Sequence, residues 1–421
     1  MNSKGIYRLI LSIGLLFFIS ACKQAQQWSG QDPIQKVSTL TRPIQKQYVG
    51  IFDLGEGIYL SNQFAGARMN GAVLTSSDKV SVLITPENTP INFSPWYAFK
   101  VWADEEKEIE LRLTYPDGTR HRYYPKLSKD GKNWTDVIEE NYDPFIVPDS
   151  TQSRVLPTYV TLKLPIGPDT LWVSAQELLT SAHNKDWIDS LAAYPFVETF
   201  TVGKSREGKI IYGMKIGEAD DSKMNMVLSR QHPPEIPGYL AMKAFVEGLC
   251  SASETAKTYR SRYNTYVIPM VNPDGVDLGH WRHGVGGIDL NRDWGDFNQP
   301  ETQAVRDFMK EKVKGGGKFF FGVDFHSTWE DIYYTINPAL VGNMPGLVPK
   351  MIENSTQGME GYEPNIRPGP SEGLVVTSSN FFFHTFGAES LTYEVGDNTP
   401  RNMVKEKGRR TAEALMELMV E

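Results

Sequence analysis

The sequence predicts two domains of different class, an antiparallel β-sandwich followed by an α/β domain built on a mixed sheet. Three observations support this prediction. A chain of 421 residues is long for a single hydrophobic core. Residues 48–165 contain short apolar runs bounded by turn residues, without a convincing helical pattern. Residues 171–421 alternate apolar strand-like runs with amphipathic stretches, which is typical of α/β domains.

The N-terminus has the pattern of an export signal. Lys4 and Arg8 precede the short apolar run 11–19, and Ser20-Ala21-Cys22 follows. The run is too short to cross a bilayer as a helix. With Ile19, these residues resemble a bacterial lipobox, so we expect residues 1–22 to be a lipoprotein signal peptide and lipobox. Lipidated Cys22 would then anchor an exported bacterial lipoprotein to a membrane of the cell envelope, on its periplasmic or surface face. A plain secretory signal with an incidental cysteine is the alternative.

Residues 23–47 are rich in Gln, Ser and Lys and show little apolar periodicity, so we expect a tether between membrane and domain. The other cysteine of the chain, Cys250, lies in an apolar-periodic stretch and is expected to be a buried small side chain. One cysteine cannot form an intramolecular disulfide, so the exported protein must rely on its hydrophobic core for stability.

The β-sandwich prediction for residues 48–165 depends on strand-like runs and turn signals. Pro116-Asp117-Gly118 is a strong hairpin signal between two of the runs. Together they favour an antiparallel sandwich. The expected strands include residues 80–84, 96–102, 109–115 and 159–164.

The α/β prediction for residues 171–421 rests on buried strand runs separated by helices. Pro237 can begin a helix, because proline is tolerated in the first turn. The expected strands lie at residues 197–202, 210–216, 224–228, 266–271, 319–325 and 390–395. Further helices are expected at residues 174–182, 186–193, 302–313 and 404–419.

Composition excludes one class of partner. The formal net charge is −8, and no run of Lys and Arg reverses it locally. A nucleic-acid partner is therefore not expected, since binding a phosphate backbone requires clustered positive charge.

One stretch suggests a metal site. His232 and Glu235 stand three residues apart, directly after the apolar run 224–228. A strand that delivers an imidazole and a carboxylate into a polar turn can form half of a zinc site. His326 ends a later run and completes a His₂Glu set with one open position, as catalytic zinc requires. Taken singly, each residue could also be a turn, helix-start or core residue.

Later stretches extend this pattern in a fixed order: Asn272-Pro273-Asp274-Gly275, Asp289-Leu290-Asn291-Arg292, Asp324-Phe325-His326 and Thr392-Tyr393-Glu394. The whole series resembles the metallocarboxypeptidase family that includes pancreatic carboxypeptidase A and the cytosolic carboxypeptidases. The resemblance implies a zinc carboxypeptidase catalytic domain holding one Zn²⁺ per chain. A looser similarity around Pro95-Trp96-Tyr97-Ala98-Phe99 extends to the N-terminal domain of the cytosolic carboxypeptidases.

The resemblance also implies roles for individual residues. Asp289 would accept a hydrogen bond from the ring nitrogen of His232 that does not bind the metal. Asn291 and Arg292 would bind a free C-terminal carboxylate, for which the arginine fork is suited. Arg282 would stabilise the oxyanion, and Glu394 would act as general base and acid for metal-activated water.

These roles have structural alternatives. Asp289 could be a turn residue, Arg282 a surface salt-bridge residue and Glu394 a buried ion-pair partner. One family feature is missing, because a substrate-contacting tyrosine should precede the catalytic glutamate, yet no Tyr lies between Tyr362 and Tyr393. The pocket that selects the substrate side chain is expected near residues 376–384.

We therefore expect an exported, lipid-anchored zinc metallocarboxypeptidase that hydrolyses the C-terminal peptide bond of peptides or proteins. One alternative is a murein peptide amidase of the same fold, cutting γ-D-glutamyl or diaminopimelate linkages of cell-wall peptides. Another is a non-catalytic surface-binding lipoprotein. Hydrolysis of muropeptides beside ordinary peptides would separate the first two, and any turnover would exclude the third.

Overall fold

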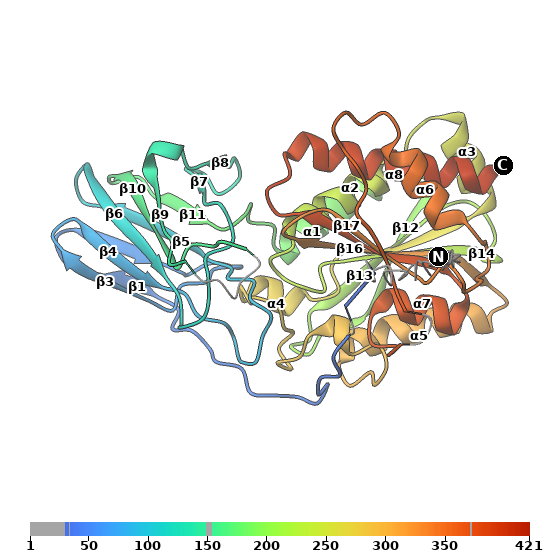
Figure 1. Cartoon of the computed structure of the whole chain (residues 1–421), viewed down its shortest axis with the longest axis horizontal. Helices are drawn as coiled ribbons and strands as arrows, with labels where there is room; N and C mark the ends of the chain where they lie inside the picture. Colours follow the sequence, from blue (N-terminus) through green and yellow to red (C-terminus); the bar gives the residue numbers. More distant parts are fainter. Residues whose placement is uncertain (1–29, 33, 149–153, 371–372) are drawn as a thin grey trace, which may run out of the picture.

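The computed structural model describes residues 30–32, 34–148, 154–370 and 373–421. Cys22 and the rest of the expected signal peptide lie outside these residues. Figure 1 shows two domains side by side, a smaller one in blue to green and a larger one in green to red. The prediction of a β-sandwich followed by a mixed α/β domain is confirmed.

Two sheets form the β-sandwich. The six-stranded sheet has the order β1 (Ile51–Asp53), β2 (Ile58–Ser61), β5 (Ala98–Ala103), β11 (Leu171–Ser174), β7 (Lys126–Ser128), β8 (Thr135–Asp136). The five-stranded sheet has the order β3 (Gly71–Ser76), β4 (Lys79–Leu83), β6 (Lys107–Thr114), β10 (Tyr159–Ile166), β9 (Tyr142–Phe145). A short 3₁₀ helix, η1 (Glu139–Asn141), precedes β9.

Strand β6 shows why the chain forms a sandwich here. Ile109, Leu111 and Leu113 are buried, whereas Arg112 between them is exposed. Successive side chains of a strand point to opposite faces, so this alternation buries one face against the other sheet. The neighbours of β6 are β4 in parallel and β10 in antiparallel orientation. The parallel β4–β6 pair departs from a purely antiparallel sandwich.

An eight-stranded mixed sheet forms the centre of the second domain. Its central strands β15, β14, β16 and β19 run parallel, and antiparallel neighbours flank them. The strand order is β12 (Val197–Lys204), β13 (Ile210–Ile216), β15 (Asn264–Ile268), β14 (Lys223–Ser229), β16 (Lys318–Thr328), β19 (Glu389–Gly396), β17 (Ile332–Thr335), β18 (Ile366–Pro368).

Helices cover both faces of this sheet (Figure 1). On one face lie α1 (Ser181–Leu191), α2 (Ile236–Leu249), α3 (Glu254–Arg262), α6 (Leu347–Thr356) and α8 (Arg401–Val420). On the other lie α5 (Pro300–Lys314) and α7 (Ser378–Phe386). The short α4 (Pro273–Asp277) and the 3₁₀ helix η2 (Leu290–Arg292) lie in the loops that follow β15.

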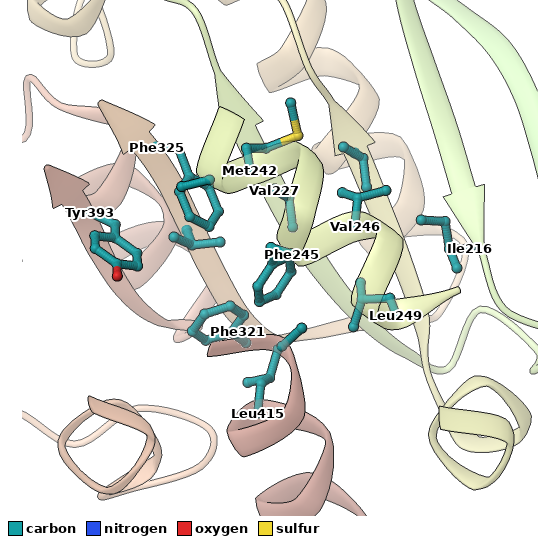
Figure 2. Packing of buried hydrophobic residues seen from close by; sticks show 14 of the residues in the cluster. Ile216, Val227, Met242, Phe245, Val246, Leu249, Phe321, Phe325, Tyr393 and Leu415 are labelled. Carbon is teal, nitrogen blue, oxygen red and sulfur yellow. The ribbon is translucent and has the colours of Figure 1, made fainter. Parts of the chain in front are cut away.

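The core explains the unbroken apolar runs of the central strands. Val227 packs under α2, where Figure 2 shows it near Phe245 and Phe325, and Leu228 packs on the opposite face with the residues of α5 and α7. Both side chains are fully buried. Strands covered on both faces therefore lose the polar alternation of a half-exposed strand.

Two boundaries differ from the prediction. Residues 171–174 form β11, which pairs with β5 and β7 of the sandwich, so the α/β domain begins after this strand and not at residue 171. The two helices expected at 174–182 and 186–193 are a single helix, α1. Thr180 caps α1 together with His183, which ends the extended chain at that point.

The described part of residues 23–47 is not a free tether, so that expectation is corrected. The backbone N–H of Gln31 donates to Pro368 O (3.1 Å), and that of Arg42 donates to Gly286 O (2.7 Å). Between them the buried Thr39 donates through Oγ1 to Asp296 Oδ2 (3.2 Å). We call residues 30–32 and 34–47 the N-terminal segment. Its first part is held on the α/β domain, and Gln47 at its end exchanges hydrogen bonds with Ala67 and Met69 of the β-sandwich. Such polar contacts leave no apolar periodicity in a sequence.

Candidate active site

The first candidate ligands follow the central strand β14. The chain leaves β14 through Arg230, whose φ of 52° is left-handed, and His232 lies in the turn that follows. Glu235 is the N-cap residue of α2, and Pro237 in the first turn of that helix needs no hydrogen-bond acceptor. Strand, turn and helix start thus fix the two side chains relative to each other.

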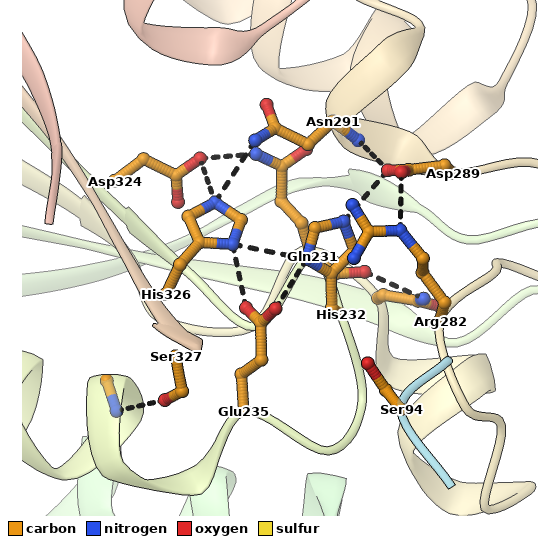
Figure 3. Close-up of polar contacts among 12 residues, drawn as sticks. Ser94, Gln231, His232, Glu235, Arg282, Asp289, Asn291, Asp324, His326 and Ser327 are labelled. Carbon is orange, nitrogen blue, oxygen red and sulfur yellow. Dashed lines mark hydrogen bonds and ion pairs between the residues drawn. The ribbon is translucent and has the colours of Figure 1, made fainter. Parts of the chain in front are cut away.

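The third candidate ligand, His326, lies on β16, which pairs in parallel with β14. Its Nδ1 lies 2.7 Å from Glu235 Oε2 and 3.2 Å from His232 Nδ1. His232 Nδ1 lies 2.8 Å from Glu235 Oε1. Figure 3 shows the three side chains converging on one point, and all three are buried. The structure therefore brings the predicted ligand set together.

The donor set fits a zinc ion. Zn–N and Zn–O bonds of about 2.0–2.1 Å in a tetrahedron place neighbouring donor atoms about 3.3 Å apart. The three ligand atoms lie within 4.8 Å of one another. The far nitrogens are already engaged, since His232 Nε2 lies 2.8 Å from Asp289 Oδ1 and His326 Nε2 lies 2.8 Å from Asp324 Oδ2. Both imidazoles therefore present Nδ1 to the shared point.

No role for Asp324 was predicted from the sequence. Its carboxylate accepts hydrogen bonds from Gln231 and Ser378 in addition to facing His326. Its position two residues before His326 on the same strand could have indicated a role, because side chains two residues apart on a strand point to the same face.

Asp289 links three elements of the site. Besides facing His232, it accepts hydrogen bonds from Arg282 Nε (2.6 Å) and from the backbone N–H of Asn291 (2.9 Å). Burial alone would raise the pKa of Asp289, but Arg282 and His232 outweigh burial and hold that pKa well below its ordinary value. Asp289 is therefore an ionised anchor, as the sequence analysis expected for its contact with His232.

Asn291 and Arg292 lie on η2, at the edge of the same cavity. Asn291 is fixed through its Oδ1, which accepts from the backbone N–H of Ser378 (3.0 Å), and its Nδ2 lies 3.3 Å from His326 Nε2. Arg292 Nη1 donates to the carbonyl of Asn291 (2.9 Å). Burial lowers the pKa of Arg292, against the opposing effect of Asp289. An anion in the cavity would therefore stabilise this guanidinium.

Glu394 lies on β19, next to His326 on β16. Its Oε2 is buried and has no hydrogen-bond partner among the described residues. Burial raises the pKa of Glu394 to about 7, with His326 opposing the rise and Glu235 adding to it. The alternative that Glu394 is a buried ion-pair partner is not supported, because Glu394 forms no salt bridge among the described residues.

A cavity of about 640 Å³ lies between the two domains and the N-terminal segment. Of the residues described so far, its lining includes His232, Glu235, Arg282, Asp289, Asn291, Arg292 and Glu394. Thr377, Ser379 and Thr392 contribute hydroxyl groups, and Ser379 Oγ lies 3.0 Å from Thr392 Oγ1. Only part of the expected pocket region 376–384 faces this cavity, since Asn380 and His384 line a neighbouring cavity of about 370 Å³.

Tyr334 also lines this cavity, and no sequence pattern pointed to it. It lies on β17, an antiparallel neighbour of β19, opposite Thr392. Burial raises the pKa of the Tyr334 phenol, and the charge of Glu394 adds to the rise. A tyrosine is thus present in the cavity, but it comes from a strand before Tyr362 instead of a loop after it.

The β-sandwich supplies a cationic side chain to the cavity wall. Arg122 donates through Nε to Asp397 Oδ2 (2.8 Å) and through Nη1 to Ser94 Oγ (2.9 Å). Both members of the Arg122–Asp397 pair are buried. The pair joins the two domains.

Comparisons with known proteins agree with this geometry. A family model described as zinc carboxypeptidase matches residues 184–341. Among solved structures, a metallo-carboxypeptidase from Burkholderia cenocepacia is similar with a TM-score of 0.70 and 17% identity, covering 86% of this chain and 98% of that one. A metallo-carboxypeptidase from Pseudomonas aeruginosa, in complex with (2-guanidinoethylmercapto)succinic acid, has a TM-score of 0.68 and 19% identity, covering 86% and 98%. At these identities the structures show a shared fold.

Curated relatives match part of the chain. Cytosolic carboxypeptidase 6 of Caenorhabditis elegans is 31% identical over 135 residues, which is 30% of this chain and 29% of that protein. Human cytosolic carboxypeptidase 2 is 24% identical over 261 residues, 56% of this chain and 28% of that protein. An uncharacterised protein of Zymomonas mobilis is 25% identical over 239 residues, 55% and 58% of the two chains. The matches thus span less than two thirds of each relative.

Proposed function

We propose that this chain is a zinc-dependent metallocarboxypeptidase that removes residues from the C-termini of peptides or proteins, in line with the zinc carboxypeptidase model that matches residues 184–341. The observation that carries the proposal is one shared cavity. It is lined by His232 and Glu235 of the buried donor set, by the guanidinium groups of Arg282 and Arg292, and by Glu394, whose Oε2 has no hydrogen-bond partner among the described residues. His326 completes the donor set next to Glu235. Metal, base and anion-binding groups in one cavity are what hydrolysis next to a free carboxylate requires.

One Zn²⁺ per chain would be held by His232, Glu235 and His326. When bound, the ion would act as a Lewis acid that activates water and polarises the scissile carbonyl. Asp289 and Asp324 keep the two imidazoles in the orientation that presents Nδ1 to the metal. The open side of the site faces the cavity, where a substrate can enter.

Arg292 and Asn291 would hold the terminal carboxylate of the substrate. The fixed amide of Asn291 and the half-buried fork of Arg292 offer several N–H donors at one edge of the cavity. Binding the terminal carboxylate there positions the last peptide bond over the catalytic residues. A blocked C-terminus would lose this charge-assisted contact.

Glu394 and Arg282 would carry out the charge and proton movements. Glu394 accepts a proton as water oxygen bonds to the carbonyl carbon, and delivers it to the amine nitrogen as the C–N bond breaks. Arg282, held by Asp289, stabilises the negative charge that develops on the carbonyl oxygen. The products are a shortened peptide with a new carboxylate and a free amino acid. Glu394 lies outside the residues that the family model matches, so its proposed role rests on its place beside His326.

The test is hydrolysis of matched peptides with free and blocked C-termini by the chain without residues 1–22, with and without a zinc chelator. We expect chelator-sensitive release of single C-terminal residues from the free peptides alone. Activity on blocked peptides, or activity that survives the chelator after metal removal is verified, would contradict the proposal. Turnover restricted to purified muropeptides would favour a murein peptide amidase, and silence on every substrate would favour a binding protein.

We also propose that the protein is a lipid-anchored component of the cell envelope. The support is the lipobox-like sequence ending at Cys22. Among the described residues, no helix is long and apolar enough to cross a membrane. Metabolic labelling with a fatty acid tests the anchor. We expect label in the native chain and its loss, with release of the protein from membranes, in Cys22→Ser.

A further inference from the structure

A carboxylate of the β-sandwich lies beneath the loop that carries Arg282. Glu87 lies between β4 and β5, and its side chain is fully buried. Its Oε2 accepts the backbone N–H of Trp281 (2.8 Å), and its Oε1 accepts those of Arg282 (3.1 Å) and His283 (2.7 Å). We call residues 280–283 the arginine loop. Three consecutive amides of this loop therefore converge on one carboxylate from the other domain.

The charge of Glu87 is compensated where it lies. Arg68 Nη2 is 4.0 Å from Oε2, and His283 Nδ1 is 3.4 Å from Oε1. Burial would raise the pKa of Glu87, but its polar neighbours, first among them His280, His283 and Arg68, lower it. Burial also lowers the pKa of His280 and brings that of His283 to about 4, so Arg68 is the nearby positive charge at neutral pH. A buried carboxylate is costly unless its hydrogen bonds are satisfied. Here the arginine loop supplies the donors.

Two more contacts from the sandwich flank Arg282. Trp281 is buried in the hydrophobic core of the sandwich, and its Nε1 donates to Trp96 O (3.1 Å). On the other side, Asn88 Oδ1 lies 2.5 Å from His283 Nδ1. The residues immediately before and after Arg282 are thus both held by the sandwich. The catalytic domain holds Arg282 through the side-chain contact to Asp289.

We propose that Glu87 is a positioning residue for Arg282, so that the β-sandwich forms a structural part of the catalytic centre. This inference rests on the proposed function for the role of Arg282. A preorganised donor stabilises an oxyanion only if it is already in place when charge develops. Glu87 fixes the backbone of residues 281–283 and with it the base of the Arg282 side chain. Asp289 fixes the guanidinium at the end of that side chain.

The test combines kinetics with hydrogen exchange on the full chain loaded with zinc. Glu87→Gln keeps the shape of the side chain but removes its charge and places an N–H₂ group against backbone donors. We expect kcat to fall about 10- to 100-fold with KM within about threefold, a fraction of the loss seen when an oxyanion donor is removed outright. In an Arg282→Ala background, Glu87→Gln should lower kcat by less than about threefold. The effects of two residues are not additive when one acts through the other.

Amide exchange provides a readout that does not depend on turnover. Glu87→Gln should accelerate exchange at residues 281–283, whereas Glu389→Gln, which alters a carboxylate that accepts a hydrogen bond from Gly342 away from the arginine loop, should leave those amides unchanged. If Glu87→Gln fails to fold, Glu87→Asp keeps the charge but is too short to reach all three amides, and the same acceleration is expected.

The outcomes are distinct. Unchanged exchange at residues 281–283, or an equal kinetic cost of Glu87→Gln with and without Arg282, would overturn the inference. If the unmodified chain hydrolyses no peptide, the proposed function fails instead. The exchange data would then still decide whether Glu87 orders the arginine loop.

Discussion

His326 and Glu394 lie side by side in register on the parallel strands β16 and β19. One is a candidate metal ligand and the other the candidate base, and hydrogen bonds of the sheet fix the spacing between them. Asp324 and Thr392 form the pair two residues earlier on the same face. Catalytic groups carried by strands are held more precisely than groups carried by loops.

Replacing Glu394 with Gln should abolish most turnover and leave the metal bound. We expect kcat to fall by about 10²- to 10⁴-fold, because the amide cannot accept the proton. Steady-state kinetics and zinc content measured on the same preparation check this. Glu389→Gln on the same strand is the control, since Glu389 accepts a hydrogen bond from Gly342 away from the cavity. A variant that kept most of its activity would contradict the mechanism.

The same substitution should stabilise the metal-free protein in a pH-dependent way. The pKa of Glu394 is raised from its ordinary value of 4.5 to about 7, chiefly by burial. Between these values the folded state binds more protons than the unfolded state, so the contribution of Glu394 to stability falls as pH rises. Above pH 7 the buried, charged carboxylate destabilises the folded state, and replacement by Gln removes that charge.

Thermal unfolding in the presence of a chelator at pH 8 and pH 4.5 measures this effect. Glu394→Gln should raise the free energy of unfolding by on the order of 1–3 kcal/mol at pH 8 and by much less at pH 4.5. An equal difference at both pH values would show that the charge of Glu394 is not the cause.

Gly238→Ala should disrupt the metal site from within α2. A Cβ at Gly238 would lie 2.2 Å from the carbonyl oxygen of His326, so helix or strand must move apart. Because Glu235 starts the same helix, the separation of two ligands would change. We expect metal affinity to fall at least 10-fold, as it does when the surroundings of a metal site are disturbed. Gly248→Ala in the same helix, which contacts only the Ala412 side chain below 3 Å, is the control. Equal affinities in the two variants would refute the prediction.

Asp289→Asn and Asp324→Asn should each weaken metal binding by about 10- to 100-fold, because each carboxylate orients one imidazole. Competition with a chromophoric chelator measures the affinity. The two should differ in kinetics at saturating zinc. Asp289→Asn should lower kcat further, since Asp289 also holds Arg282. Equal kcat values for the zinc-saturated variants would argue against the link through Asp289.

Arg122→Met should destabilise the fold by about 3–5 kcal/mol, because it leaves Asp397 charged and unpaired in the interior. Burial raises the pKa of Asp397 even with Arg122 present, and removing the arginine would raise that pKa further. The loss should therefore shrink as pH falls and Asp397 takes up a proton. Denaturant midpoints at pH 5 and pH 8 check the trend. Arg122→Met/Asp397→Asn should recover much of the stability at pH 8, and a double variant no more stable than the single one would be inconsistent with this explanation.

Much of the fold could be predicted because its signals are local. The run 390–395 is strand β19 within a residue at each end, and the start of α2 at Pro237 was predicted within one residue. Elements whose identity depends on a distant partner were missed. Residues 171–174 join the sandwich by pairing with β5, about seventy positions earlier in the chain. The N-terminal segment is held by single polar contacts that leave no pattern.

From the sequence alone one could predict the domain classes, the His232, Glu235 and His326 donor set, and the carboxylate and arginines expected around it. These follow from residue type, local spacing and family resemblance. Only the tertiary structure decided what supports them. Three supporting residues are recognised only by their contacts in the folded chain. Asp324 contacts His326, Tyr334 lines the cavity, and Glu87 accepts backbone hydrogen bonds from the arginine loop. Glu87 and Arg282 are 195 positions apart, and no local periodicity records a contact across that distance.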